Sequence, residues 1–316
     1  MALKAEYCRV PIEVIQRYGG EVPFDLYLRL SDDKLVRVGH ANDNVKDTVA
    51  HYIEKGVKEI FAIKDDYLRF VDLMNKELTS KFFDVDTSSD EKIKILQSSF
   101  SVLKEALCKI GIQEKSITLA RELAKKSGEL ISKQMFTKEL FAKYKNQCSS
   151  EYIRCLFVGS VVMSMFDNLE WQSESVRQHA MEALLLRDIL LSPDDFVSLK
   201  QNREMPKKLP THVYNHPLDV VKLMTQDGCR DFSQDVQIMI EQHHERPDGV
   251  GFPGQVADTS ISLMSAMIIV ADEFIDRMID SAFDFDKRML VLNELLGIFK
   301  KGNYRKALNV LNLGID

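Results

Sequence analysis

Two adjacent histidines and two acidic residues lead into a loop rich in glycine and proline, where HHERPDGVGFPG spans residues 243–254. Imidazole nitrogens and carboxylate oxygens are ligands that Fe, Mn and Zn accept in proteins. The segment GVGFPG also fits the dinucleotide pattern G-x-G-x-x-G, but that pattern needs a strand before the first glycine and a helix after it. SQDVQIMIEQ precedes the histidines with helical spacing of its apolar residues, and Pro253 removes a backbone donor from any phosphate-binding loop. The stretch therefore favours metal binding over nucleotide binding.

Other polar residues are expected on apolar helix faces. Asp188 has leucines one turn away on either side, and Asp272 has isoleucines at the same spacing. A buried carboxylate costs several kcal/mol unless it is paired, protonated or bound to a metal. His243 and His244 each follow an apolar residue by four positions, so both imidazoles are expected to face the interior. The two acids therefore need partners, and the histidines are candidates.

A further histidine, His216, lies in the segment NHPLDVV. We expect Pro217 at the first position of a helix, with His216 just outside it. Each residue has a plainer interpretation, because a lone histidine on an apolar face is usually a satisfied core residue and a lone aspartate is usually a salt-bridge partner. Three imidazoles and two carboxylates at the core edges of one helical region together favour a metal site.

Composition excludes several classes of protein. The net charge of −6 argues against a polymeric nucleic acid as partner, because such binding neutralises many phosphates with clustered Lys and Arg. Five cysteines without C-x-x-C spacing predict neither a disulfide framework nor a zinc knuckle, and they favour a reducing compartment. The longest apolar run is too short to cross a bilayer, so we expect a cytoplasmic protein that does not bind membranes.

The 316 residues are enough for two domains. Strand patterns at 24–30, 35–41 and 59–64 alternate with helical patterns at 45–56 and 65–78, which predicts a small α/β domain. Beyond a polar linker, apolar residues recur at steps of three and four in segment after segment, which predicts a helical bundle. We expect a mainly α protein with three parts: a small α/β sensor or regulatory domain at 1–85, a helical linker region at 86–145, and a helical metal-binding domain at 146–316. The polar segment 84–92 marks the passage from the first part to the second.

HHERPDGVGFPG resembles the HHExxDGxGYP signature of HD-GYP proteins, the metal-dependent hydrolases of the HD superfamily that cleave cyclic di-GMP. Members of that family also carry HDIGK on an earlier helix, a histidine followed by proline, and an aspartate on a late helix. The same order here reads RDILL, NHP and VADEF, and the resemblance covers roughly residues 146–290. It implies an HD-type helical bundle domain preceded by a small α/β domain.

The resemblance implies a complete set of ligands for one divalent transition metal, with Fe or Mn favoured. The set comes from three separate segments and consists of Asp188, His216, His243 and His244. The loop that follows would contact the substrate or stiffen the site through Arg246, Asp248, Gly249, Gly251, Phe252 and Pro253. Phe252 stands where the family has tyrosine, so one hydroxyl donor is lost and the aromatic ring remains. Glycines permit unusual backbone angles and prolines stiffen them, so we expect the loop to keep its shape.

A second metal in such proteins shares Asp188 and uses the late aspartate, here Asp272, with two further histidines. Cys155 and Arg187 stand at those two histidine positions. A guanidinium stays protonated and cannot ligate, whereas Cys155 is either a thiolate ligand or a small core residue. Glu151 matches an acid that joins a further metal in some members. It is therefore a candidate ligand in place of the missing histidines. One or two ions per chain are both compatible with this pattern.

Arg187 itself has two interpretations. It neutralises Asp272 or Glu151 in a salt bridge, which we favour, or it contacts a phosphate of the substrate. Leu191 replaces the lysine of HDIGK.

Two functions follow from the pattern. The first is a phosphodiesterase of weak activity on cyclic di-GMP or a related phosphodiester, with Asp188 and Arg187 as its catalytic residues. The second is a catalytically degenerate, metal-containing signalling module that binds cyclic di-GMP or a partner protein through the GFP loop. The intact histidines favour the first, and the residues at 187 and 191 favour the second.

Overall fold

The computed structural model describes residues 7–10, 15, 21–31, 34–57, 59–82, 87–134, 143–144, 151–169, 173–226, 231–256 and 260–313. The chain forms two compact units, Met1–Lys126 and Ser127–Asp316. Helices dominate the described residues and the strands are confined to the first unit, which confirms the mainly α fold class with a small α/β part ahead of it. Every helix within the described ranges is too short or too polar to cross a membrane.

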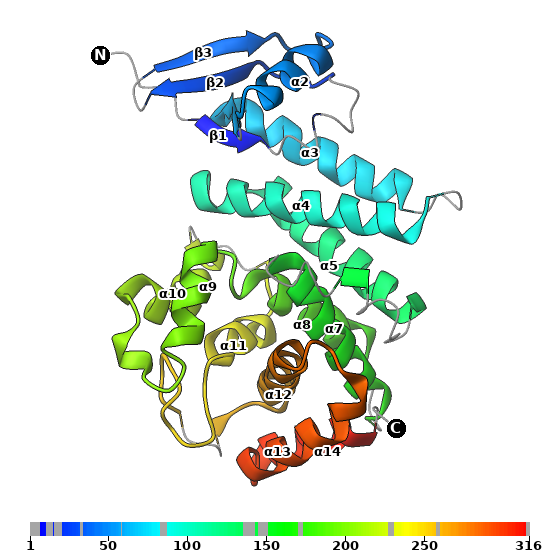
Figure 1. The fold of residues 1–316 in the computed structure, drawn as a ribbon, viewed down its shortest axis with the longest axis vertical. Coiled ribbons are helices and arrows are strands. Elements are labelled where there is room, and N and C mark those ends of the chain that lie inside the picture. Colours follow the sequence, from blue (N-terminus) through cyan, green and yellow to red (C-terminus); the bar gives the residue numbers. More distant parts are fainter. Residues whose placement is uncertain are drawn as a thin grey trace. The chain divides into compact units, whose positions relative to one another are not determined.

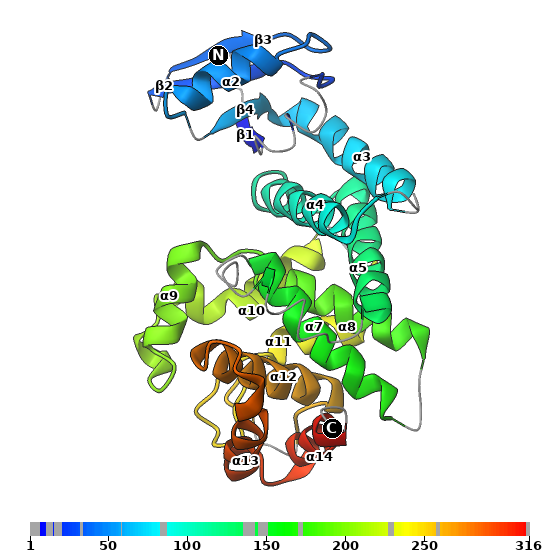
Figure 2. The same ribbon diagram turned by 45° about the vertical axis from the view of Figure 1, so that its right-hand side comes forward.

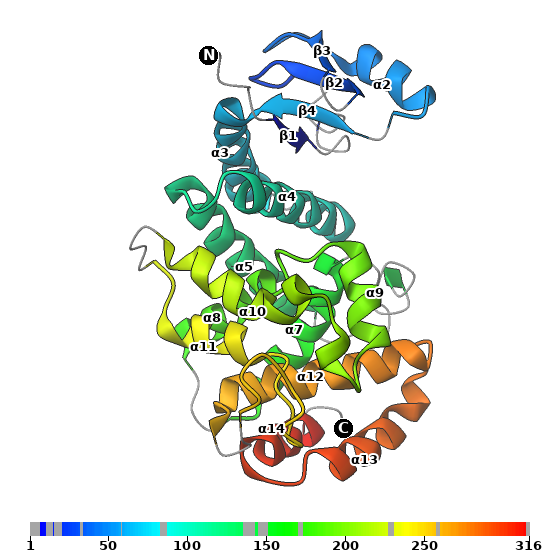
Figure 3. The ribbon, with the colours of Figure 1, turned by 90° about the vertical axis from the view of Figure 1, so that its left-hand side faces the viewer.

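The first unit contains an antiparallel sheet with the strand order β1-β4-β2-β3 (Figure 3). Its strands are β1 (Tyr7–Val10), β2 (Leu26–Ser31), β3 (Lys34–Gly39) and β4 (Ile60–Ile63). The strand patterns of the sequence predicted β2, β3 and β4 but not β1. That strand has four residues and pairs with β4, which lies far along the chain, so no local hairpin signal marks it.

Three helices complete most of the first unit: α2 (Lys46–Glu54), α3 (Lys64–Lys81) and α4 (Ser89–Lys109). Helix α3 packs against β1, β4 and α4 (Figures 1 and 2). Its Tyr67 and Phe70 are fully buried and meet edge to face, with ring centroids 5.6 Å apart. Phe70 also meets Phe24, which lies just before β2, edge to face with ring centroids 5.3 Å apart, so aromatic packing holds the helix against the sheet.

The polar segment expected at 84–92 holds the start of α4. The side chain of Ser88 accepts a hydrogen bond from the backbone N–H of Glu91, so Ser88 is the N-cap and the helix begins inside the expected linker. Residues 84–86 lie outside the described residues. The boundary between the two units falls within α5 (Glu114–Gln134), inside the region expected at 86–145. The division into three parts stays a prediction.

The second unit is a bundle of helices around α7. Its elements are α7 (Glu151–Asp167), α8 (Glu174–Leu186), α9 (Pro193–Gln201), η2 (Pro206–Lys208), α10 (Thr211–Met224), α11 (Gln234–Gln242), α12 (Leu263–Asp280), η5 (Phe285–Lys287), α13 (Arg288–Ile298) and α14 (Gly302–Leu313). Helix α7 is apolar on all sides and packs against α8, α12 and α14. A helix that is hydrophobic all round belongs in a core, and α7 is the core helix of this unit.

Two helices of the bundle were absent from the sequence prediction. Helix α9 begins with a capping box in which the side chains of Ser192 and Asp195 bond to each other's backbone N–H groups, and Pro193 fills its first turn. Helix α14 buries Tyr304 and Leu308, four residues apart. Both signals are present in the sequence, and α9 is the one that matters for the site because it follows Asp188.

Candidate metal centre

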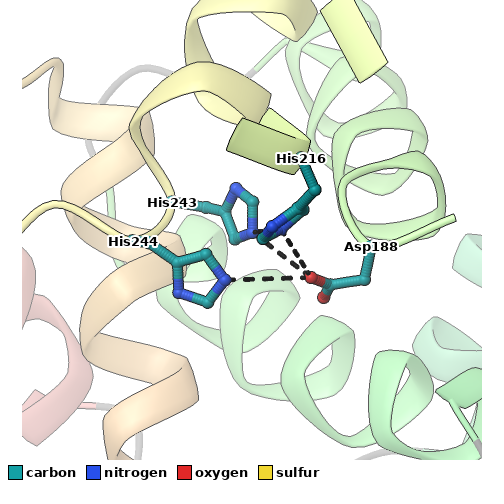
Figure 4. Close-up of side chains that lie close together, drawn as sticks. All are labelled: Asp188, His216, His243 and His244. Carbon is teal, nitrogen blue, oxygen red and sulfur yellow. Dashed lines mark hydrogen bonds and ion pairs between the residues drawn. The ribbon is translucent and has the colours of Figure 1, made fainter. Parts of the chain in front are cut away.

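Four side chains from separate segments meet in the second unit (Figure 4). Asp188 lies in the turn between α8 and α9, His216 lies on α10, and His243 and His244 end α11. One ligand atom from each lies within 4.8 Å of all the others. Asp188 Oδ1 is 3.3 Å from the Nε2 atoms of both His216 and His243, and 3.9 Å from Nε2 of His244. The geometry thus brings together all four residues expected for one metal.

The position of His216 corrects one expectation of the sequence. Pro217 does not begin α10 but lies inside it, because the helix starts at Thr211. A proline has no N–H, so the carbonyl of Val213, four residues earlier, lacks its helical donor. His216 Nδ1 lies 2.6 Å from that carbonyl and donates to it. The His-Pro pair therefore turns the imidazole so that its Nε2 faces Asp188.

His243 is oriented by the same device at the end of another helix. It is the C-cap of α11, where backbone carbonyls lose their helical partners. Its Nδ1 lies 2.6 Å from the carbonyl of Ile240 and donates to it. Because a carbonyl only accepts, the neutral ring carries its proton on Nδ1 and its lone pair on Nε2. The Nε2 atoms of His216 and His243 then lie 3.3 Å apart with lone pairs facing each other.

His244 completes the group from the other side. Its ring stacks on Phe252, with centroids 4.5 Å apart and planes 19° apart. Its Nε2 is buried and has no hydrogen-bond partner among the described residues. A buried nitrogen without a partner costs free energy, so its direction toward Asp188 needs an explanation.

The charges of the four side chains explain why Nε2 of His244 points toward Asp188. Burial lowers the pKa of His243 below its ordinary value and that of His244 well below it, so both rings are neutral near pH 7. Burial alone would raise the pKa of Asp188, but its contacts with the rings of His216 and His243 and the charge of Arg187 hold that pKa well below its usual range. An ionised carboxylate and imidazole nitrogens that present lone pairs to one point repel one another. A cation at that point removes the repulsion and satisfies His244, so the donor set fits a transition metal.

Arg187 and Asp272 form a buried pair beside this group. Arg187 is 3% exposed and donates through both terminal nitrogens to Asp272, with Nη2 2.8 Å from Oδ1. Its Nε donates to Asp188 Oδ2 at 3.1 Å. Arg154 on α7 also contacts Asp272, at 3.2 Å, and pairs with Asp276. The structure therefore gives Asp272, expected as a second-metal ligand, two guanidinium partners, and it places Arg187 in the favoured salt bridge.

The other residues expected near a second metal also lie outside the group of four. Cys155 is buried on α7, and burial raises the pKa of its thiol to about 12, so it is protonated near pH 7. Glu151 begins α7 and is only partly buried. A protonated thiol is a poor metal ligand.

The loop after the histidines is held by a residue whose part the sequence did not predict. Glu245 is 2% exposed, and its carboxylate accepts from the backbone N–H groups of Gly254 at 2.7 Å and Val256 at 3.1 Å. Gly249 has a φ of 72°, and a Cβ on Gly251 would lie 2.4 Å from the backbone nitrogen of Arg246. The loop folds back onto the helix end at a distance that only glycine permits.

The remaining loop residues rest on polar and aromatic contacts. Arg246 Nη2 pairs with Asp248 at 2.8 Å and with Glu204 at 3.3 Å. Phe252 is buried between the rings of His244 and Tyr214. Pro253 follows it through a cis peptide bond. One side of the site is thus a stack of aromatic rings, and Arg246 of the loop is already paired with two acids.

Leu191, at the position of the family's lysine, lies in an apolar cluster. It is 1% exposed and packs with Leu209, Val213 and Phe252. No lysine of the described residues takes its place in that cluster.

Arg154 and Asp276 also belong to the site, and sequence reasoning missed both. A signal for Arg154 existed, because it is a charged residue within the otherwise apolar core of α7. A buried arginine requires carboxylate partners, and α12 supplies two of them four residues apart, Asp272 and Asp276.

Comparison with known proteins gives one informative result. No protein-family model matches the sequence, and no curated protein matches it either. Among solved structures the chain is similar to Bd1817, an HDG"Y"P protein from Bdellovibrio bacteriovorus, with a TM-score of 0.57 and 14% identity over 97% of this chain and 98% of that one. The chain therefore has an HD-GYP-like fold, which confirms the expected HD-type helical bundle with a small α/β domain ahead of it. At this identity the likeness establishes the fold, and the ligands rest on the geometry of this chain.

Substituting Gly251→Ala should destabilise the second unit. The added Cβ would meet backbone atoms of Arg246 and Glu245, which cannot move aside as a flexible side chain would. We expect a loss of about 1–3 kcal/mol, the range for overpacking a filled site, measured by urea unfolding. Gly297→Ala is the matched control, because a Cβ there meets nothing within 4 Å and alanine favours the helix. Equal unfolding midpoints for the two variants would contradict the packing described for the loop.

Proposed function

We propose that this chain is a metal-dependent phosphodiesterase of weak activity that acts on cyclic di-GMP or a related phosphodiester. The observation that carries the proposal is the convergence of four lone-pair donors, Asp188, His216, His243 and His244, at one buried point of an HD-type bundle. The substrate class comes from the resemblance of HHERPDGVGFPG to the HD-GYP signature.

The four residues would hold one divalent transition metal, with Fe or Mn favoured for three nitrogens and one carboxylate. The buried and unpartnered Nε2 of His244 supports this assignment, because a bound cation satisfies it. Such an ion would act as a Lewis acid toward the phosphoryl group and would acidify water, which is how metal ions promote phosphodiester hydrolysis at neutral pH.

The surrounding residues fix the donors before any ligand arrives. The carbonyls of Val213 and Ile240 keep the Nδ1 protons of His216 and His243 away from the site. Phe252 covers one face of the His244 ring and excludes water from it. A preorganised, partly dry site strengthens every electrostatic contact that a substrate phosphate would make.

A second candidate function is a metal-containing signalling module that binds cyclic di-GMP or a partner protein without turnover. Three observations favour it. Arg187 and Asp272 are bound to each other, and an apolar leucine, Leu191, is buried where the family has a lysine. Arg246 on the loop is paired with two acids, so its charge is largely neutralised before a phosphate binds.

Product formation separates the two functions. The purified protein, loaded with Mn(II) or with Fe(II) without oxygen, is incubated with cyclic di-GMP and the products are separated by chromatography. The proposal expects slow hydrolysis that stops when a chelator removes the metal. Bound metal and bound cyclic di-GMP without any product would favour the module instead.

Substituting His243→Ala should remove the metal and the stability it contributes. A ligand present at about 100 times its dissociation constant stabilises the folded state by about 2.7 kcal/mol, so the variant should no longer gain stability when Mn(II) is added. Thermal unfolding with and without chelator measures the gain.

His212→Ala provides the control for this test. His212 is exposed and pairs with Asp195 outside the group of four, so this variant should keep both the metal and its stabilising effect. Equal metal contents for the His243→Ala variant and the unmodified protein would refute the ligand assignment.

A further inference from the structure

The guanidinium of Arg187 is a buried cation in the second unit. It is 3% exposed, and each of its three nitrogens donates to a carboxylate. Two nitrogens form a bidentate pair with Asp272, and Nε reaches Asp188. A guanidinium is planar, permanently charged and a donor only, so it can bridge two carboxylates without any titration.

Both carboxylate oxygens of Asp272 already accept hydrogen bonds from arginines in this arrangement. Its Oδ2 accepts from Nη1 of Arg187, and its Oδ1 accepts from Nη2 of Arg187 and from Arg154 at 3.2 Å. Arg154 is fixed in turn by Asp276 on the same helix. A divalent ion on Asp272 would have to displace a bidentate, buried ion pair, which is strongly unfavourable.

Asp188 is divided between two cations. Its Oδ2 accepts from Arg187 at 3.1 Å, whereas its Oδ1 faces the Nε2 atoms of the three histidines. The carboxylate therefore stands between a guanidinium on one side and a group of imidazole lone pairs on the other. In a site for two metals the same carboxylate would bridge two ions.

We propose that the Arg187 guanidinium takes the place of a second metal ion, so that the centre holds one ion per chain. This inference rests on the proposed metal centre and deepens it, because it fixes the number of ions and gives Arg187 a positioning role. Arg187 neutralises Asp272 and holds Asp188 so that Oδ1 points at the histidines. Unlike a metal, this cation is not removed by a chelator.

The arrangement also accounts for weak hydrolysis. A pair of metals clamps both the attacking and the leaving oxygen of a phosphodiester, whereas Arg187 is buried and three of its five N–H donors already bind carboxylates, which leaves it poorly placed to bind a phosphate as well. Arg187 therefore supplies charge to the protein and not to the substrate. These three hydrogen bonds favour the salt bridge over the contact with substrate phosphate that the sequence left open.

The number of ions in the unmodified protein tests the inference directly. Metal-free protein is titrated with Mn(II), and bound metal is counted by mass spectrometry after free metal is removed. We expect one ion per chain at saturation. Two ions per chain would overturn this inference and leave the proposed function standing, and no bound ion would overturn both.

Substituting Arg187→His should open the second position, because it replaces a fixed cation with a neutral ring that offers a lone pair. We expect this variant to bind close to two Mn(II) ions per chain. Arg203→His is the matched control: Arg203 contacts Glu273 and Asp276 in the same network but neither Asp188 nor Asp272, so this variant should still bind one ion. A folded Arg187→His variant that binds one ion would refute the role assigned to the guanidinium.

Paramagnetic resonance of the unmodified protein decides the question if the Arg187→His variant does not fold. Two neighbouring Mn(II) ions couple magnetically, and a single ion does not. The inference expects an uncoupled Mn(II) signal at every loading. A coupled signal that grows as Mn(II) approaches saturation would overturn the inference. The measurement is specific, because a salt bridge with a purely structural role would have no effect on whether the Mn(II) signal is coupled.

Discussion

Lone pairs that face one another in a buried space need a cation, and the second unit is built around that constraint. Asp188 Oδ1 and the Nε2 atoms of His216 and His243 lie within 3.3 Å of one another, and Nε2 of His244 is buried beside them without a hydrogen bond. Water or protons could relieve part of the repulsion, but burial keeps the two adjacent histidines neutral. A metal ion satisfies all four atoms at once, and the proposed function follows from that fit.

The bundle produces this arrangement by leaving backbone carbonyls without helical partners at two places. Pro217 inside α10 leaves the carbonyl of Val213 without its donor, and the end of α11 does the same for Ile240. The Nδ1 atoms of His216 and His243 take up those carbonyls. The carbonyls left unpaired by the interrupted helices thus orient the imidazoles that would bind the metal. The same residues therefore serve both local structure and chemistry.

The sequence predicted which four residues lie together because they are marked by type and by spacing. His243 and His244 follow a helical pattern, Asp188 lies on an apolar face, and the segment HHERPDGVGFPG resembles a long family signature. It predicted the salt bridge of Arg187 with Asp272 only as one of two alternatives and did not predict the contact with Arg154, because these residues become neighbours only in the folded bundle. The predicted start of α10 was also wrong, because Pro217 lies inside the helix, where the imidazole of His216 replaces the missing N–H donor to the carbonyl of Val213.

Arg187 pairs with Asp272, which a site for two metals on the same fold would use as a ligand. In our proposal this pairing is the reason that the protein hydrolyses its substrate weakly or only binds it. The central claim concerns the atoms that surround the ion, and X-ray absorption at the metal edge of the Mn-loaded or Fe-loaded protein measures them. The account predicts a first shell of nitrogen and oxygen with the scattering pattern of about three imidazoles, as the donor set requires. Sulfur in that shell, or a bound metal without imidazole scattering, would contradict it.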